Sequence, residues 1–127
     1  LTHGEGSSGS SDAYATTFSN INDSHQSSLG MMTGAELYSG AYGDSMRIDG
    51  YEAAYNGLVR PRAIVMHGAE YARAEFVDTY GRAGQSWGCP AVDDRRVDDV
   101  IAVLSEGSML FFWYPDGDWS ESSDYLD

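Results

Sequence analysis

The clearest periodic pattern of apolar positions lies between residues 93 and 105. Apolar side chains recur there at i, i+3, i+4 and i+7, opposite aspartates and arginines, at Val97, Val100, Ile101 and Leu104. Asp93 precedes the pattern in a position suited to an N-cap, and Gly107 follows it as a residue that readily takes the left-handed conformation. The pattern predicts one clear amphipathic helix.

The other apolar runs are short and bounded by glycine or proline, which is typical of β-strands. The two strongest are residues 62–66, which end at His67-Gly68, and residues 109–114, which end at a Pro-Asp-Gly turn. His67 is therefore predicted at the carboxyl end of a buried strand. Shorter strands are predicted at 13–18, 36–38 and 45–48, a short helix within 70–80, one helical turn within 51–58 and a mobile Gly/Ser-rich loop at 4–12.

These elements predict a single β-rich α+β domain over residues 1–127. A chain of 127 residues buries roughly two-thirds of the surface that it exposes when unfolded, which is enough for one hydrophobic core. No stretch of the sequence approaches the roughly 20 apolar residues that a membrane-spanning helix requires. We therefore expect no membrane span in this chain.

The charge balance excludes two classes of partner. The chain has 20 acidic residues against 7 basic ones, all of them arginines, and a formal net charge of −13. The one adjacent basic pair, Arg95-Arg96, stands between aspartates. Nucleic acids and anionic membrane surfaces are bound by clustered positive charge, so neither is an expected partner.

The single cysteine lies in a sequence that favours chemistry. Cys89 follows Gly88 and precedes Pro90, although a lone cysteine is more often a small buried apolar residue. The glycine lets the backbone approach a ligand closely, and N–H groups in such a turn can converge on an oxyanion. A thiol with a pKa of about 8.5 is mostly protonated at neutral pH, so a nucleophilic cysteine needs a neighbouring base.

His67 is the best candidate for that base, because a strand holds a side chain more precisely than a loop does. His3 and His25 lie in Gly/Ser-rich stretches and are interpreted as solvated loop histidines. Three histidines and Cys89 offer zinc ligands, but no CxxC, HxxxH or HExxH spacing occurs, so we expect no metal. No G-x-S-x-G motif, P-loop or Rossmann fingerprint is present, and we expect no organic cofactor.

Three segments in order resemble a known family: IVMHGAEY from residue 64, GRAGQSWGCPAV from residue 81 and GSMLFFWYPD from residue 107. They are similar to the murein L,D-transpeptidase catalytic-domain-like proteins, a branch of the YkuD-type L,D-transpeptidases. A papain-like thiol hydrolase is disfavoured, because its cysteine precedes its histidine. The resemblance implies a YkuD-like mixed β-sheet or sandwich with further strands before Leu1, so that the domain is expected to be amino-terminally incomplete.

The resemblance also implies residue roles. Cys89 would attack a carbonyl of a peptidoglycan stem tetrapeptide, expel D-alanine and form a thioester, while His67 takes the thiol proton. The carbonyl of Gly68 would orient the imidazole, and Ser86 would shape the turn. The oxyanion hole would consist of the backbone amides of Trp87, Gly88 and Cys89. A second stem peptide as acceptor would give a 3→3 cross-link, and water would give L,D-carboxypeptidase hydrolysis.

Two positions depart from the main branch of this family. Trp87 stands where that branch has a second histidine, and Pro90-Ala91 stands where an Arg or Asn often follows the cysteine. Arg82 is the candidate replacement for binding a substrate carboxylate. Peptidoglycan stem peptides are the expected partners, in the periplasm, cell wall or extracellular space. A catalytically silent wall-binding module of the same fold is the alternative.

Overall fold

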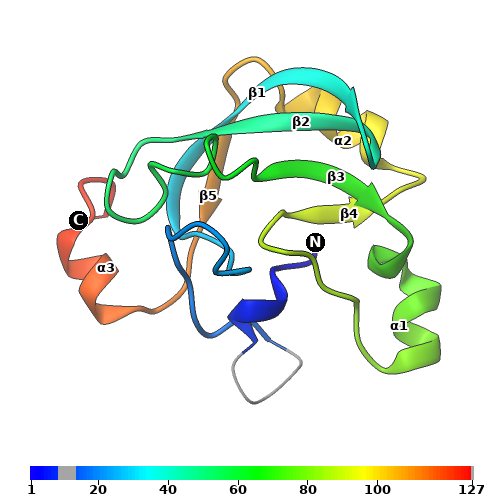
Figure 1. Cartoon of the computed structure of the whole chain (residues 1–127), viewed down its shortest axis with the longest axis horizontal. Coiled ribbons are helices and arrows are strands. Elements are labelled where there is room, and N and C mark those ends of the chain that lie inside the picture. Colours follow the sequence, from blue (N-terminus) through cyan, green and yellow to red (C-terminus); the bar gives the residue numbers. More distant parts are fainter. Residues whose placement is uncertain (9–13, 127) are drawn as a thin grey trace.

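The computed structural model describes residues 1–8 and 14–126, which form one five-stranded sheet with helices at its margins (Figure 1). The strands are β1 (Gly30–Gly40), β2 (Gly43–Gly50), β3 (Val65–Ala69), β4 (Ala91–Asp93) and β5 (Met109–Phe112). The helices described are α1 (Ala74–Tyr80), α2 (Val97–Leu104), α3 (Gly117–Ser122) and two 3₁₀ turns, η1 (Glu5–Ser7) and η2 (Glu70–Ala72). The chain thus has the predicted β-rich α+β class.

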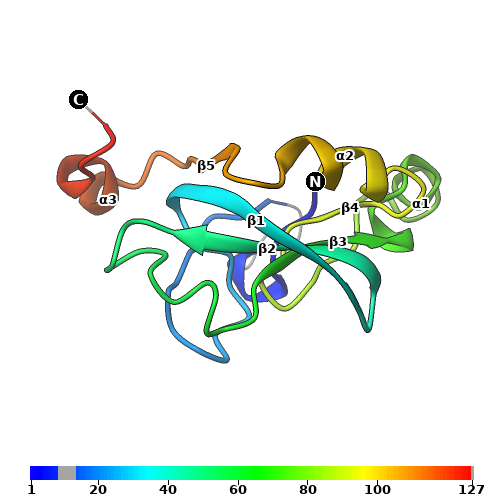
Figure 2. The ribbon, with the colours of Figure 1, turned by 90° about the horizontal axis from the view of Figure 1, so that it is seen from above.

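The sheet is mixed and curls into a half-barrel. Its strand order is β4-β3-β2-β1-β5, and only β3 and β4 pair in parallel. The crossover between these two strands passes through α1, as a parallel pair requires. Figure 2 shows α2 on one side of the sheet and the long β2–β3 connection on the other.

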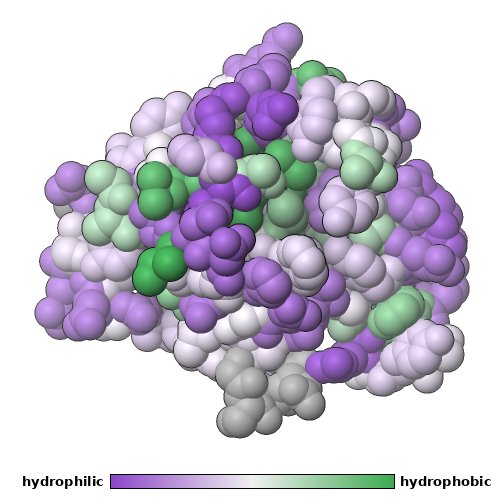
Figure 3. Space-filling model, in the orientation of Figure 1, coloured by the Kyte–Doolittle hydropathy of each residue, from purple (hydrophilic) through white to green (hydrophobic). Residues whose placement is uncertain are grey.

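The core lies between the sheet and α2. Met46 and Ile48 of β2 are fully buried and belong to one cluster with Val97 and Ile101 of the helix. Burying a side chain of this size contributes about 1.5–3 kcal/mol each, so the apolar stripe of α2 fixes the helix against the strands. Figure 3 shows the face of the sheet opposite to α2, where hydrophobic residues lie toward the middle and the right-hand edge is hydrophilic.

A buried carboxylate ties the carboxyl-terminal helix to the sheet. Glu52 accepts hydrogen bonds from Trp119 Nε1 at 3.0 Å, Ser123 Oγ at 2.6 Å and the Met31 amide at 2.6 Å. Trp119 itself is 0% exposed. Because each carboxylate oxygen has donors, burial of the charge is compensated and α3 packs as part of the fold.

Several predicted elements are confirmed in type but shifted in extent. The predicted strands at 36–38 and 45–48 lie within β1 and β2, and the run 109–114 contains β5. The helix predicted within 70–80 is α1, which ends at Gly81 in the left-handed region with φ 76°. Residues 53–63 form consecutive turns, so the expected helical turn does not grow into a helix.

Other predictions were wrong. Helix α2 begins at Val97, four residues after Asp93, because Asp93 ends β4 and its carboxylate accepts from the Arg95 amide at 2.9 Å. Strand β3 begins at Val65 and places His67 at its centre. Residues 14–18 form no strand, and Ala13 lies outside the described residues. Helix α3 was not predicted.

The Gly/Ser-rich amino-terminal stretch was also misjudged. Residues 9–12 of the predicted mobile loop lie outside the described residues, but residues 4–8 contain η1 and bury Ser7 completely. Glycine content there allows close packing, since a Cβ on Gly4 would lie 2.2 Å from the His25 carbonyl. None of the helices in the described chain has the length and hydrophobicity needed to span a bilayer.

Candidate active site

Cys89 lies in the turn that leads into β4, with its sulfur directed at the start of β3. Cys89 Sγ accepts a hydrogen bond from the Val65 amide at 3.4 Å and donates one to the Ala63 carbonyl at 3.7 Å. Burial raises the pKa of the Cys89 thiol, while the Val65 N–H and the positive charge of Arg62 oppose this rise. The resting sulfur is therefore a protonated thiol at neutral pH.

The turn around Cys89 is shaped by the hydroxyl of Ser86. Ser86 Oγ donates to the Cys89 carbonyl at 2.6 Å and accepts from the Gly88 amide at 3.2 Å. Gly88 has φ 111°, which favours glycine, and a Cβ there would lie 2.7 Å from the Gln26 carbonyl. The turn can therefore form only with glycine at position 88.

Two of the three predicted oxyanion donors are available in this turn. Among the described residues, no carbonyl or side-chain acceptor is hydrogen-bonded to the amides of Trp87 or Cys89. The Gly88 amide is instead engaged by Ser86 Oγ. Since a hydroxyl is both donor and acceptor, it can release this amide by rotating, which would free all three N–H groups for a developing oxyanion.

His67 is held in one tautomer on the strand beside Cys89. Its Nδ1 lies 3.0 Å from the Gly68 carbonyl, which can only accept, so Nδ1 carries the proton and Nε2 is the basic nitrogen. The side chain is 2% exposed and stacks on the ring of Tyr42 at 4.5 Å. No hydrogen bond joins the imidazole to Cys89 Sγ in the described structure; the sulfur instead contacts Val65, two positions earlier in β3.

Gly68 also has a packing reason to be glycine. A Cβ at this position would lie 2.8 Å from the Asp94 Cα and 3.1 Å from Val97 Cγ1. The absence of a side chain lets the β4–α2 connection lie directly against β3. The same glycine thus supplies the carbonyl that orients His67 and the space that brings the two parallel strands' ends together.

Arg62 is the arginine whose charge acts on the thiol, and the sequence analysis missed it. Its guanidinium donates four hydrogen bonds, all to uncharged acceptors in residues 19–28: Ser19 O at 2.8 Å, Ser28 Oγ at 2.9 Å, Ser24 Oγ at 3.2 Å and Gln26 O at 2.9 Å. Burial lowers the pKa of Arg62 and the nearby Cys89 raises it. The sequence signal was an arginine at the first position of the predicted buried run 62–66, where a charge is seldom placed without partners.

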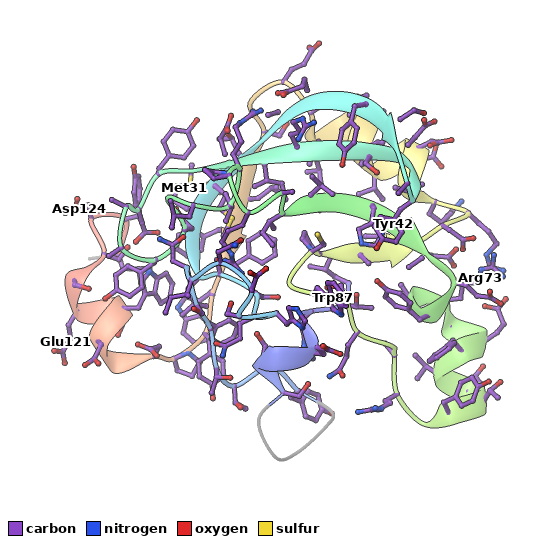
Figure 4. The ribbon with its side chains drawn as sticks, viewed as in Figure 1. Met31, Tyr42, Arg73, Trp87, Glu121 and Asp124 are labelled. Atoms are coloured by element: carbon purple, nitrogen blue, oxygen red, sulfur yellow. The ribbon has the colours of Figure 1, made fainter. Side chains whose placement is uncertain are left out.

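Aromatic residues border the site. Tyr42, from the β1–β2 turn, covers His67, and Tyr71 of η2 lies close enough to Cys89 and Tyr42 for their charges to act on its hydroxyl. Burial, aided by those two groups, raises the pKa of Tyr71 to about 12. Figure 4 shows Tyr42 near the carboxyl ends of β3 and β4, and Trp87 beside the segment that leads into β4. Neither tyrosine was singled out from the sequence.

The amino-terminal segment and the 24–28 loop complete the wall around the turn. The Thr2 amide donates to Ala91 O at 2.8 Å, and the Ser86 amide donates to His3 O at 3.1 Å. Trp87 stacks on His25, so neither predicted loop histidine is remote from the site.

Arg82, the predicted carboxylate ligand, is exposed in the bend after α1. A cavity of about 550 Å³ lies alongside, lined by Glu70, Tyr71, Arg73, Glu75, Phe76, Thr79 and Tyr80.

No metal site accompanies these groups within the described residues. His3, His25 and Cys89 do not gather, and no group of three or more His, Cys, Asp or Glu side chains in residues 1–8 and 14–126 is arranged to hold an ion. The hydrogen bonds of the Cys89 sulfur instead go to backbone groups of Ala63 and Val65. What the residues offer is a thiol, a base of fixed tautomer and backbone donors.

An imidazole on a strand and a thiol in the glycine-containing turn that leads into the adjoining parallel strand are typical of cysteine-dependent acyl-transfer domains. The chain belongs to the L,D-transpeptidase catalytic domain family, whose model matches residues 1–113. The resemblance read from the sequence is thereby confirmed, and the family's chemistry is peptidoglycan cross-linking. No curated protein sequence and no solved structure gives a significant match to the chain.

Proposed function

We propose that the chain is a thiol-dependent acyltransferase acting on peptidoglycan stem tetrapeptides. Cys89 Sγ attacks the carbonyl that precedes the terminal D-alanine, the S–C bond forms and the C–N bond to D-alanine breaks. His67 Nε2 takes the thiol proton and returns it to the departing amine. Attack on the thioester by a side-chain amine of a second stem peptide gives a 3→3 cross-link, and attack by water gives hydrolysis.

The observation that carries this proposal is the fixed tautomer of His67. Its Nδ1–H is committed to the Gly68 carbonyl at 3.0 Å, which leaves Nε2 as the proton acceptor on the strand next to Cys89. A thiol whose pKa is raised by burial cannot ionise unaided at neutral pH, so a base is required. The amides of Trp87, Gly88 and Cys89 are the proposed oxyanion hole, with Ser86 ordering them.

The proposed cellular location follows from the family. A member acting on the wall works outside the cytoplasmic membrane, so we place this protein in the periplasm, cell wall or extracellular space. Arg82 is retained as the proposed ligand of a stem carboxylate, with Arg82→Ala expected to raise KM more than it lowers kcat. The catalytic domain is proposed to span residues 1–127, because Trp119 and Glu52 join the segment after residue 113 to the sheet at 3.0 Å.

Intact-protein mass spectrometry with a disaccharide tetrapeptide tests the mechanism. A covalent adduct lacking one D-alanine is expected, with none in Cys89→Ala and slower formation in His67→Ala. Circular dichroism of each variant checks that the fold is retained. If folded parent protein gives neither adduct nor product, the thioester assignment is refuted.

One observation favours a second candidate, a catalytically silent wall-binding module. In the described structure the Cys89 sulfur is hydrogen-bonded to the Ala63 carbonyl and the Val65 amide, and the Tyr42 ring stacks on the His67 imidazole. If these contacts persist with substrate, the proton cannot be transferred. Co-sedimentation of Cys89→Ala and parent with purified peptidoglycan, measured beside turnover, separates the two: retained binding with no parental turnover favours the module.

A further inference from the structure

The most exposed tryptophan of the site is held in a fixed orientation. Trp87 is 71% exposed, yet its indole lies parallel to the imidazole of His25 at 4.4 Å and 8° between ring planes. His25 has a left-handed backbone with φ 56°, and its Nδ1 lies 2.8 Å from Glu5 Oε1. One face of the indole is therefore covered by the imidazole, and the other is open to solvent.

This aromatic pair, which we call the Trp87 platform, is rigidly linked to the thiol. Trp87 precedes Cys89 by two residues, so their Cα atoms lie within about 7 Å. Ser86 Oγ fixes the intervening turn through the Cys89 carbonyl and the Gly88 amide, at 2.6 and 3.2 Å. Figure 4 shows Trp87 directed away from the sheet, on the side of the amino-terminal segment. A ligand on the platform would adjoin the reacting sulfur.

The chemistry of the platform favours a neutral sugar ring. A pyranose packs its C–H face against an aromatic face, whose quadrupole is negative, and keeps its hydroxyls in water. The half-exposed Glu5 carboxylate, 2.8 Å from His25 Nδ1, holds the imidazole against the covered face and leaves the open face to the sugar.

We infer that the Trp87 platform binds a pyranose ring of the glycan strand, so that the site takes its donor stem while the stem is attached to sugar. The inference rests on the proposed function for the peptide part of the substrate. Its sugar-binding part stands on Trp87, His25 and Glu5 alone. It narrows the proposed donor substrate from any stem peptide to a stem peptide that is still linked to the glycan.

Binding is tested first with sugar alone. Isothermal titration uses a β-1,4-linked trimer of N-acetylglucosamine against the parent protein, Trp87→Ala and the matched control Trp113→Ala, whose tryptophan is 60% exposed outside the site. Loss of one stacking face is expected to weaken binding about tenfold in Trp87→Ala and not in the control. His25→Ala weakens binding, and His25→Phe, which can still stack, restores it.

Substrate preference gives the second readout. The ratio of kcat/KM for a disaccharide tetrapeptide to that for the free tetrapeptide should fall about tenfold in Trp87→Ala and stay unchanged in Trp113→Ala. Sugar binding without turnover of either substrate would refute the proposed function and leave the platform standing. Absence of sugar binding by the parent, equal binding by Trp87→Ala, or displacement of the sugar by a free diamino acid would overturn the inference.

Discussion

Replacing Arg62 by methionine tests whether a half-buried arginine without a carboxylate partner stabilises the fold and lowers the pKa of the Cys89 thiol. The guanidinium donates four hydrogen bonds to uncharged groups of residues 19–28, between 2.8 and 3.2 Å. A net contribution of about 0.5–1.5 kcal/mol for each of the four bonds gives about 2–6 kcal/mol. We expect a loss in the lower part of this range, about 2–4 kcal/mol, because Arg62 is only partly buried and water can replace some of the bonds. At roughly 4 °C per kcal/mol, the midpoint of thermal unfolding should fall by about 8–16 °C.

Arg60→Met is the matched control, two positions away. Arg60 is more exposed, and its partners are the carboxylates of Glu36, at 2.6 Å, and Asp49. Exposed ion pairs contribute little because water screens them and side-chain entropy opposes them. We therefore expect a much smaller change in the unfolding midpoint, measured by differential scanning calorimetry. Equal losses in the two variants would refute the reasoning.

The same substitution has an effect on reactivity. The charge of Arg62 lowers the pKa of the Cys89 thiol against the rise caused by burial, so removing it should raise that pKa further. Alkylation by iodoacetamide at neutral pH should slow in Arg62→Met and recover partly in Arg62→Lys, which keeps the charge but not the planar fork. An unchanged alkylation rate in Arg62→Met would contradict the electrostatic part.

Three further predictions concern the turn, the thiol and the carboxyl-terminal helix. Gly88→Ala should destabilise the protein more than Gly107→Ala. Both glycines have positive φ, 111° and 99°, but only a Cβ at position 88 would clash with another segment, at the Gln26 carbonyl. Equal denaturation midpoints would contradict this. Because burial raises the Cys89 pKa, the free energy of unfolding should fall as pH rises above about 8.5, and Cys89→Ala should remove that fall in urea titrations. Glu52→Gln should lower the free energy of unfolding by about 1–3 kcal/mol, because the glutamine amide N–H would face another donor, the Met31 amide or Trp119 Nε1. Tryptophan fluorescence should then report unfolding at a lower urea concentration; an unaltered transition would exclude the anchoring role.

The sequence predicted the elements whose pattern is local. The apolar stripe ending at Leu104 identified α2, and Gly81 marked the end of α1. Helix α3 was missed because its stability comes from one tryptophan donating to Glu52, 67 residues away. Likewise Asp93 has the residue type of an N-cap, but pairing of β4 with β3 takes that position into the sheet.

The candidate site divides in the same way. Cys89, His67 and Ser86 stand in recognisable local motifs, whereas Arg62 acts through a loop 34 to 43 residues distant. Tyr42 reaches His67 only because β2 pairs with β3, which brings the β1–β2 turn over the imidazole. The spacing of residues along the chain cannot predict such long-range contacts. These are the parts that pairing and packing decide.

The pairing of residues near Leu1 with the turn before β4 bears on how the protein is made. The Thr2 amide donates to the Ala91 carbonyl and the Ser86 amide donates to the His3 carbonyl, so residues 2 and 3 can form these contacts only after synthesis of the chain as far as β4. Contacts of such long sequence separation form late in folding, because the entropy of closing the loop opposes them. In a nascent chain Cys89 therefore lacks its folded surroundings, and we expect its site to assemble only after the whole domain has been synthesised.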